Sequence, residues 1–324
     1  MAKMLVCGVV NWDVTLFVDR LPGPGQEVNV NNIISVPGGK GGNTAVAGAK
    51  ILGPGQVGLL AMLGSDDIAS KQLDFLAKDG VDTTCVLQQD AVGSGQAHIA
   101  VDSKGENMIL TFKAANQMLT AEILNTDKVR SSLEQSDLLV IIDPPLQVAG
   151  ALAEYGKKND KTVVWSPALL TTLGFSVLAK YMQNSDYLIL NEHEAMQLAG
   201  QDDGRNACAE LSNRLAGKKV ITTLGSQGCL VCFEDKTALI PAMDLAAFGL
   251  ETISTVGAGD AFVGAFAAFK LQSKEDFESL FLASIAAAIK TTRKETRASP
   301  DLKEILHYAN DSRLADSWKK IRFS

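Results

Sequence analysis

Met4-Leu5-Val6-Cys7-Gly8-Val9-Val10, near the start of the chain, is a short apolar run without alternating polar positions. Such a run is typical of a strand buried on both faces, as in a parallel sheet. Buried strands that alternate with helices predict an α/β fold, with a mostly parallel central sheet and helices on both faces. Similar runs recur at Val57–Leu63, Leu138–Ile142, Thr162–Trp165, Tyr187–Leu190, Lys219–Thr223 and Gly228–Phe233. Helical spacing marks Asp67–Asp79, Leu146–Lys157, Asn206–Ala216, Gly259–Leu271, Phe277–Thr292 and Pro300–Leu306.

Four further strand-like segments contain polar residues and fit this buried sheet less well. Val14–Asp19 and Glu27–Val36 precede the first helix, whereas Gln96–Val101 and Asn107–Lys113 follow about sixty residues later. Mixed polarity is typical of a small antiparallel sheet with one solvated face and one covering face. We therefore expect a β lid beside the main domain. The expected boundaries are 14–36 and 96–113 for the lid, and 1–13, 37–95 and 114–324 for the main α/β domain.

Composition and charge argue against several classes of protein. The chain has 324 residues, 46% apolar and 21% charged, which is enough for one large α/β domain with a small appendage. A net charge of −7 argues against nucleic acid or an anionic membrane as a partner. No early segment resembles an export signal and no apolar stretch reaches about 18 residues, so we expect a cytoplasmic protein. The five cysteines favour reduced thiols, and Cys229 and Cys232 are expected to be core residues on opposite faces of a strand, a metal or redox site being the alternative.

A glycine-rich segment, Pro37-Gly38-Gly39-Lys40-Gly41-Gly42-Asn43, precedes the helical stretch Thr44–Leu52. Four glycines in five positions disfavour regular structure, so we expect open backbone here. The free N–H groups of the following helix, together with the charge of Lys40, favour an anion. The segment is not a Walker A loop, because Ile34 stands where that motif has its first glycine and Gly41 replaces its Ser or Thr. A tight strand-to-helix turn is the alternative interpretation.

A second segment, Ser254-Thr255-Val256-Gly257-Ala258-Gly259-Asp260, leads into the helical stretch Ala261–Leu271. Gly257, Ala258 and Gly259 present bare amides at a helix start, which suits an anion. An aspartate in the first helical turn can simply complement the helix dipole, for about 0.3–1 kcal/mol. A carboxylate beside an anion cradle, however, suits a reaction in which a hydroxyl loses a proton while negative charge builds on phosphate. We therefore predict that Asp260 is a general base.

Two other segments place polar groups after predicted strands. Asn191-Glu192-His193-Glu194-Ala195 follows Tyr187–Leu190, at the strand end where open α/β sheets bind ligands. Glu194 could hold Mg²⁺ through water, because that ion keeps much of its hydration shell. Helix capping is the alternative role for these residues. Thr223-Leu224-Gly225-Ser226-Gln227-Gly228 is a glycine turn between two strands, either part of a ligand site or a plain hairpin.

Together these segments resemble the ribokinase-like (PfkB) carbohydrate kinases, in the order typical of that family and from Gly8 to about Pro300. Gly38 to Asn43 is similar to the first signature of the family, and Gly257 to Asp260 to the second. Other matches are Gly8 to Asp13 (the opening sugar-binding segment), Pro22 to Glu27 (the turn before the second lid strand), Asn191 to Ala195 (the Mg²⁺ and phosphate motif), Thr223 to Gly228 (the nucleotide loop) and Gly105-Glu106-Asn107 with Ala115-Asn116 (the lid hairpin of the ribokinases).

The resemblance implies ATP-dependent phosphorylation of a sugar hydroxyl, with ribose favoured as the acceptor and ribose 5-phosphate as the product. It assigns Asp260 as the base, and the lid as the element that pairs two subunits into a homodimer. The implied anion hole is Gly257, Ala258 and Gly259. The implied sugar-binding residues are Asn11, Asp13, Gly39, Lys40, Asn43 and Glu106. The implied nucleotide-binding residues are Asn191, Thr223, Gly225 and Gly228, with Glu194 holding Mg²⁺ through water.

The sequence also departs from this family pattern at two places. Ser254 stands where the ribokinases usually have Asp, and Glu295-Thr296 where they usually have Gly-Ala. The resemblance places both beside a monovalent-cation site, and loss of a carboxylate weakens such a site. We therefore expect weak or absent K⁺ activation. The alternatives are a nucleoside kinase or a fructokinase-like sugar kinase on the same fold and, in another class, a non-catalytic sugar or nucleotide sensor.

Overall fold

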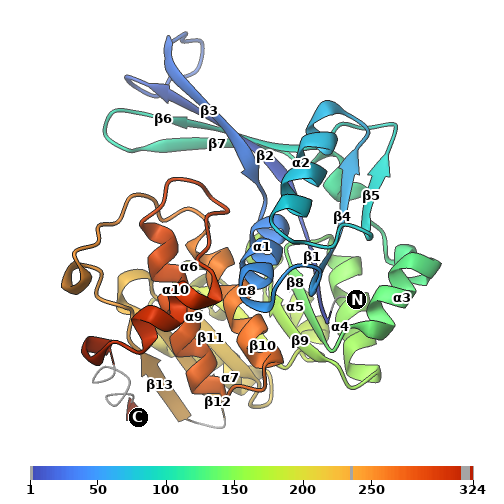
Figure 1. Ribbon diagram of the computed structural model, residues 1–324, viewed down its shortest axis with the longest axis vertical. Coiled ribbons are helices and arrows are strands. Elements are labelled where there is room, and N and C mark those ends of the chain that lie inside the picture. The colour runs from blue at the N-terminus through green and yellow to red at the C-terminus, as the bar shows by residue number, and fades with distance from the viewer. Residues whose placement is uncertain (1–2, 234–235, 315–321, 324) are drawn as a thin grey trace.

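The computed structural model describes residues 3–233, 236–314 and 322–323, and its largest element is a ten-stranded sheet (Figure 1). The strands from β5 to β11 along this sheet pair in parallel, and the β11, β12, β13 and β14 edge pairs antiparallel. The predicted mostly parallel sheet is therefore confirmed. In spatial order the strands are β14 (Arg322–Phe323), β13 (Lys236–Ile240), β12 (Cys229–Phe233), β11 (Lys219–Thr223), β10 (Tyr187–Asn191), β9 (Thr162–Ser166), β8 (Leu138–Ile142), β1 (Met4–Gly8), β4 (Val57–Gly64) and β5 (Val86–Gln89).

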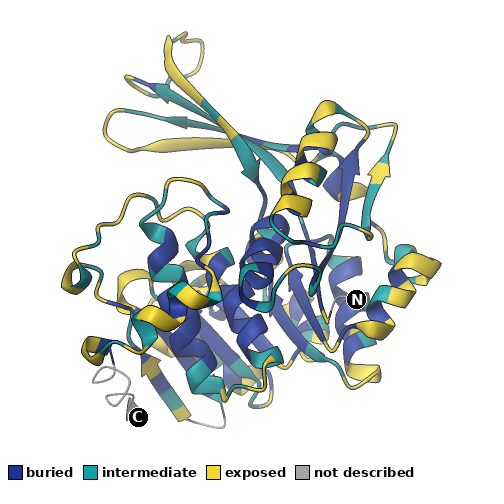
Figure 2. Ribbon diagram, viewed as in Figure 1, coloured by how far each residue is buried: buried dark blue, intermediate teal, exposed yellow. Residues whose placement is uncertain are grey.

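Helices cover both faces of the large sheet. Alternate residues of one strand therefore enter two different hydrophobic cores: Met4 and Val6 join the core beneath α1, α8 and α9, and Leu5 and Cys7 the core beneath α4 and α7. Figure 2 shows this sheet as the buried centre of the molecule. The helices are α1 (Lys40–Leu52), α2 (Asp67–Lys78), α3 (Asp127–Gln135), α4 (Leu146–Lys158), α5 (Phe175–Met182), α6 (Glu192–Ala199), α7 (Gly204–Arg214), α8 (Ala258–Leu271), α9 (Asp276–Thr291) and α10 (Leu302–Ala309).

The two cysteines three residues apart lie on β12 and point to opposite faces, as predicted. Cys229 is in the core with α8 and α9, and Cys232 is in the core with α7. All five cysteines of the chain are buried free thiols. In the part of the chain that the structure describes, no helix has the length and apolar character needed to cross a membrane.

A four-stranded sheet projects from the main domain, in the order β3 (Val30–Gly38), β2 (Asn11–Val18), β6 (Gly95–Val101) and β7 (Asn107–Phe112) (Figure 1). The four polar strand-like segments of the sequence form this sheet, as expected. Its two hairpins, β2–β3 and β6–β7, are antiparallel. The central pair, β2 and β6, is parallel, because the chain passes through α1, β4, α2 and β5 before it re-enters the sheet.

The expectation of open backbone through the first glycine segment was wrong in its second half. Helix α1 begins at Lys40, so Gly41 and Gly42 are helical and buried. A Cβ on Gly41 would lie 2.5 Å from the carbonyl carbon of Gly8, and a Cβ on Gly42 would overlap the guanidinium of Arg297. These glycines are therefore required for close packing of the helix start.

Candidate active site

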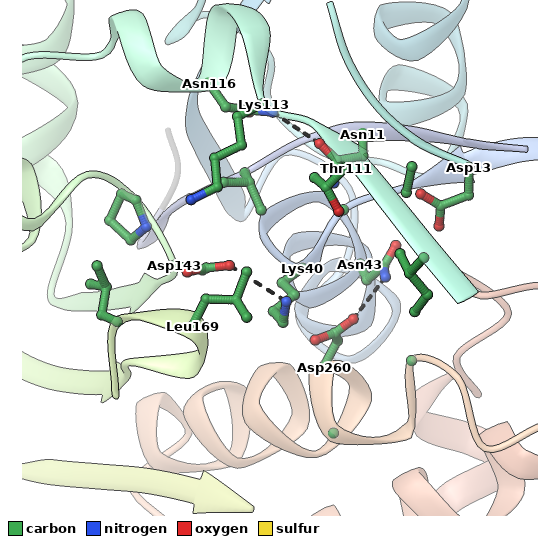
Figure 3. A pocket seen from close by; sticks show the side chains of 18 of the residues that line it. Asn11, Asp13, Lys40, Asn43, Thr111, Lys113, Asn116, Asp143, Leu169 and Asp260 are labelled. Atoms are coloured by element: carbon green, nitrogen blue, oxygen red, sulfur yellow. Dashed lines mark hydrogen bonds and ion pairs between the residues drawn. The ribbon is translucent and has the colours of Figure 1, made fainter. Parts of the chain in front are cut away.

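A cavity of about 600 Å³ lies between the small sheet and the strand ends of the large sheet (Figure 3). Five of the six predicted sugar-binding residues line it, namely Asn11, Asp13, Gly39, Lys40 and Asn43. The lid contributes Ala97, Ile99, Ile109 and Thr111, which occupy alternate positions and so share one face of β6 and β7. The main domain contributes Asp260 with three other residues of the second glycine segment, Val256, Gly257 and Gly259.

Asp260, in the first turn of α8, lines this cavity with its carboxylate (Figure 3). The amide Nδ2 of Asn43 donates a hydrogen bond of 2.7 Å to Asp260 Oδ2. Burial raises the pKa of Asp260, while the Asn43 hydrogen bond and the charge of Lys40 oppose the rise. A carboxylate in this state combines a free edge toward the cavity with increased basicity, as a general base requires.

Only part of the predicted anion hole has amides available for an anion. Gly257 has a left-handed φ of 84°, and a Cβ there would lie 2.5 Å from the carbonyl oxygen of Thr296. The Ala258 amide already donates to the Thr255 carbonyl at 3.1 Å, so the prediction for Ala258 needs correction. Within the described residues, the amides of Gly257 and Gly259 have no such partner and remain for an anion at the start of α8.

Lys40 lies among three carboxylates that line the cavity, those of Asp13, Asp143 and Asp260. Its ammonium lies 3.4 Å from Asp143 Oδ2. Burial raises the pKa of Asp143, and the charge of Lys40 offsets part of this rise. Burial likewise raises the pKa of Asp13 to about 6, against the opposing charge of Arg297 and with a further rise from Asp260. The site therefore holds an excess of carboxylates that act as hydrogen-bond acceptors for hydroxyl groups.

Asn11 is fixed by two groups that converge on the start of the lid. Asn116 Nδ2 donates to Asn11 Oδ1 at 2.9 Å, while Asn116 Oδ1 accepts from the Val10 amide at 3.0 Å. Gln72 Nε2 donates to the Asn11 carbonyl at 2.6 Å. Asn116 also lines the cavity. The side chain of Asn11 is thus held rigidly, as a residue that orients a ligand must be.

Arg297 is a site residue that the sequence analysis missed. Its side chain is only 6% exposed, and its guanidinium donates to the Gly38 carbonyl at 2.7 Å and to Asn43 Oδ1 at 3.3 Å. Because the Asn43 oxygen faces Arg297, its amide nitrogen faces Asp260. Arg297 therefore sets the orientation of the amide that holds the carboxylate.

Asp143 was also missed, although the sequence contains a signal for it. It follows directly on the buried strand β8, at the edge where ligands bind in parallel sheets, and two prolines come next. The residue has a left-handed φ of 57°, which aspartate tolerates better than most side chains. Arg297, by contrast, lies in an irregular segment without any local pattern.

A second cavity, of about 970 Å³, contains all four predicted nucleotide-binding residues. These are Asn191, Thr223, Gly225 and Gly228. Apolar residues from α8 and α9, among them Phe262 and Ala287, form another part of the lining. Gly259 lines both cavities, so the start of α8 is the point at which they meet.

The two remaining predicted residues lie outside these linings. Glu194 forms a capping box with Asn191: its Oε2 accepts from the Asn191 amide at 3.0 Å and its own amide donates to Asn191 Oδ1 at 2.8 Å. Burial raises the pKa of Glu194, and Lys40 partly offsets that rise. Glu106 is exposed between β6 and β7, and its amide donates to Asp102 Oδ1 at 2.9 Å. The lid hairpin extends past the cavity before it turns, so Glu106 does not line the cavity in this conformation, and its contact with a sugar stays a prediction.

Sequence comparison links the chain to a family of enzymes. The model of the family described as pfkB family carbohydrate kinase matches residues 1–303. The ribokinase of Haemophilus influenzae is 30% identical over 94% of this chain and 97% of its own length. The deoxyribokinase of Salmonella typhi is also 30% identical, over 91% of this chain and 95% of its own length.

Solved structures agree with this relationship. The structure of Arabidopsis thaliana ribokinase complexed with ribose and ATP superposes with a TM-score of 0.87 at 25% identity, over 96% of this chain and all of that one. Ribokinase from Thermotoga maritima superposes with a TM-score of 0.83 at 28% identity, with the same coverage. Both sheets of the present chain therefore lie within a known architecture.

Proposed function

We propose that this chain, which belongs to the pfkB family of carbohydrate kinases, transfers the γ-phosphoryl group of ATP to a pentose hydroxyl, with D-ribose as the acceptor and ribose 5-phosphate as the product. One observation carries the proposal: Gly259 lines both cavities, and Asp260 follows it at the wall of the smaller one. A phosphoryl donor in one cavity and an alcohol in the other would meet there. The ATP and ribose bound to the related Arabidopsis enzyme support the assignment of the two substrates.

In the proposed reaction Asp260 accepts the proton of the attacking hydroxyl. The new bond joins that oxygen to the γ-phosphorus of ATP, while the bond from this phosphorus to the bridging oxygen breaks and ADP leaves. The amides of Gly257 and Gly259 donate to the oxygens of the transferred group, where negative charge accumulates. Asn43 keeps Asp260 aligned with the hydroxyl through its 2.7 Å hydrogen bond.

The residues near α6 suit Mg²⁺ held through water. The Glu194 oxygen Oε2 is committed to the Asn191 amide, which leaves Oε1 for a water molecule of the ion. No group of three or more His, Cys, Asp and Glu side chains in the described ranges forms a cage for a metal. Such sparse ligation is typical of Mg²⁺ that arrives with nucleotide phosphates, whose charge the ion neutralises.

Deoxyribose is the second candidate acceptor, because the deoxyribokinase relative is as similar as the ribokinase. The two sugars differ in one hydroxyl, and the carboxylates and amides of the smaller cavity offer several acceptors and donors for it. Sites that bind a hydroxyl through buried polar groups discriminate strongly against its absence. We expect the chain to prefer ribose.

Initial rates with ATP and Mg²⁺ on ribose, deoxyribose, fructose and nucleosides test the proposal. Ribose should give the highest kcat/KM and ribose 5-phosphate as the product. A higher kcat/KM on a nucleoside or on fructose would assign one of the alternative acceptors instead. Binding of ribose and ATP without turnover on the whole panel would overturn the kinase assignment in favour of a sensor.

We propose further that the lid pairs two copies of the chain. Met108, Leu110 and Phe112 alternate along β7 with the cavity-lining residues and so lie on the opposite face of the sheet. Their side chains are 42%, 64% and 54% exposed. An apolar row of this kind is typical of an interaction surface, and a second lid is the partner of matching shape and character.

The buried free thiols support a reducing, cytoplasmic location.

A further inference from the structure

We infer that Lys290 is a built-in monovalent cation, a positioning residue whose ammonium supports the loop of the anion hole. The inference rests on the proposed function, because it assigns a role in the same reaction. Lys290 lies in the last turn of α9, and its side chain is 0% exposed. A lysine at the end of a helix normally extends its ammonium into water, so complete burial requires an explanation.

The surroundings of the ammonium point to the loop before α8. Its hydrogen bond within the described residues is to the carbonyl oxygen of Ser254, at 3.3 Å. The amides of Ile253 and Ser254 both donate to the Thr291 carbonyl, at 2.8 and 2.9 Å. The first residues of the glycine segment are therefore fastened to the end of α9 both by their backbone and by the Lys290 charge.

Charge balance connects this lysine to the base. A buried ammonium with so few acceptors is unstable unless negative charge lies nearby. Burial lowers the pKa of Lys290, and the charges of Asp260 and then Glu295 raise it, against a smaller opposing effect of Arg293. Reciprocally, Lys290 lowers the pKa of Asp260, as do Asn43 and Lys40, whereas Asp143 raises it. Lys290 lines neither cavity, so its positive charge acts on the Asp260 carboxylate from within the packed protein.

The position of the Lys290 ammonium also accounts for the two departures of the sequence from the family pattern, at Ser254 and at Glu295-Thr296. The expected weak K⁺ response was based on Ser254 and on Glu295-Thr296, and Lys290 binds the Ser254 carbonyl directly. Carbonyl oxygens and a nearby carboxylate are the ligands that an alkali cation takes, and an ammonium group has a similar size and the same charge. A covalently held cation would make an exchangeable ion unnecessary.

Three variants separate this role from simple packing. Lys290→Met keeps the length of the side chain and removes its charge, and Lys290→Ala leaves room for a small cation. Lys270→Met is the matched control, because Lys270 is a poorly exposed lysine in the last turn of α8 that pairs with Asp276 outside both cavities. Each protein is assayed with its best acceptor in KCl or in choline chloride at equal ionic strength, and its melting temperature is recorded.

We expect Lys290→Met to lower kcat about tenfold, less than the 10²–10³-fold loss on removing a direct anion-hole donor, with the sugar KM within about twofold. The acidic limb of the pH–rate profile of Lys290→Met should move to higher pH, because the pKa of Asp260 rises when the positive charge of Lys290 is removed. Lys290→Ala should lose a similar share of its kcat in choline chloride and recover part of it in KCl. The kcat of the wild type and of Lys270→Met should be the same in both salts.

Turnover within twofold of wild type in both folded Lys290 variants, with an unchanged pH profile, would overturn the inference. Strong activation of the wild type by KCl would do the same. If Lys290→Met does not fold, the response of Lys290→Ala to KCl decides the matter alone. A wild type without activity on any acceptor contradicts the proposed function, whereas an active wild type with unaffected variants contradicts only the role of Lys290.

Discussion

Asp13 and Asp260 illustrate how burial prepares single residues for this chemistry. Both carboxylates have a raised pKa, chiefly because burial disfavours the charged form. Lys40 and Arg297 limit the rise for Asp13, whose pKa is about 6. In the proposed reaction both groups are ionised, Asp13 to accept a hydrogen bond from the sugar and Asp260 to accept a proton.

The pH dependence of sugar use follows from these shifts. A carboxylate is ionised above its pKa, so kcat/KM for the sugar should be retained above pH 6 and decrease as the pH falls through about 6. Initial rates between about pH 4.5 and 8 measure this limb. A profile that stays level to the lowest pH in a folded enzyme would contradict the assignment of Asp13 and Asp260.

Arg297 should contribute to stability and turnover together. Arg297→Met removes the donors to the Gly38 carbonyl and to Asn43 Oδ1, and breaking a buried polar arrangement costs about 2–4 kcal/mol. It also frees the Asn43 amide to rotate away from Asp260, so kcat should fall. Urea unfolding and initial rates measure the two effects. Arg214→Met, at a surface ion pair with Glu210, is the control and should change stability by less than about 1 kcal/mol.

Residues within a motif were predictable from the sequence, and residues outside one were not. Lys40 and Asn43 line the cavity as expected, because each is next to glycines that mark a close approach of the backbone, and Asp13 was identified through the opening segment from Gly8 to Asp13. Arg297 and Lys290 carry no local pattern, since their positions depend on packing between segments far apart in the chain. The exposed position of Glu106 depends on the length of the hairpin, which a motif does not specify.

At the level of elements, the start of α1 determines the geometry of the smaller cavity. Gly41 and Gly8 are in backbone contact, which brings Lys40 and Asn43 to the end of β1. Alanine is intrinsically better than glycine in a helix by about 1 kcal/mol. Here its Cβ would lie 2.5 Å from the Gly8 carbonyl carbon, so the helix would have to shift.

Gly41→Ala should therefore destabilise the protein, by about 1–3 kcal/mol as for other overpacked sites. It should also raise the sugar KM, because Lys40 and Asn43 move with the helix. Chemical denaturation and initial rates test this. Gly23→Ala is the control, since a Cβ there meets nothing nearer than 3.6 Å, and an equal loss of stability in both variants would contradict the packing argument.

Most strands of the large sheet were predicted from the apolar runs of the sequence, and their ends lie within a few residues of the expected ends. The parallel pairing of β2 with β6 was not predictable from the sequence. It depends on which strand the chain pairs with when it returns to the small sheet after four intervening elements. The short strand β5 and the edge strand β13 were also missed, since polar residues interrupt their patterns. Pairing and edges are settled by tertiary contacts.

At the scale of the whole molecule, the smaller cavity lies between the two sheets, and the outer face of the lid is exposed. Leu110→Glu would place a charge in the proposed contact between two lids, so the dimer should dissociate, as light scattering after gel filtration would record. Leu306→Glu, at an exposed position on α10, is the control and should leave the mass unchanged. A monomeric wild type would contradict the lid dimer.

The two cavities meet at the start of α8, where Asp260 faces the smaller one (Figure 3). The turnover number of Asp260→Asn, measured with saturating ATP and sugar, tests most directly whether this carboxylate is the base. We expect turnover to fall by about 10²–10⁴-fold while the dissociation constants of sugar and nucleotide stay within about threefold. A folded Asp260→Asn enzyme with near wild-type turnover would contradict the role of Asp260.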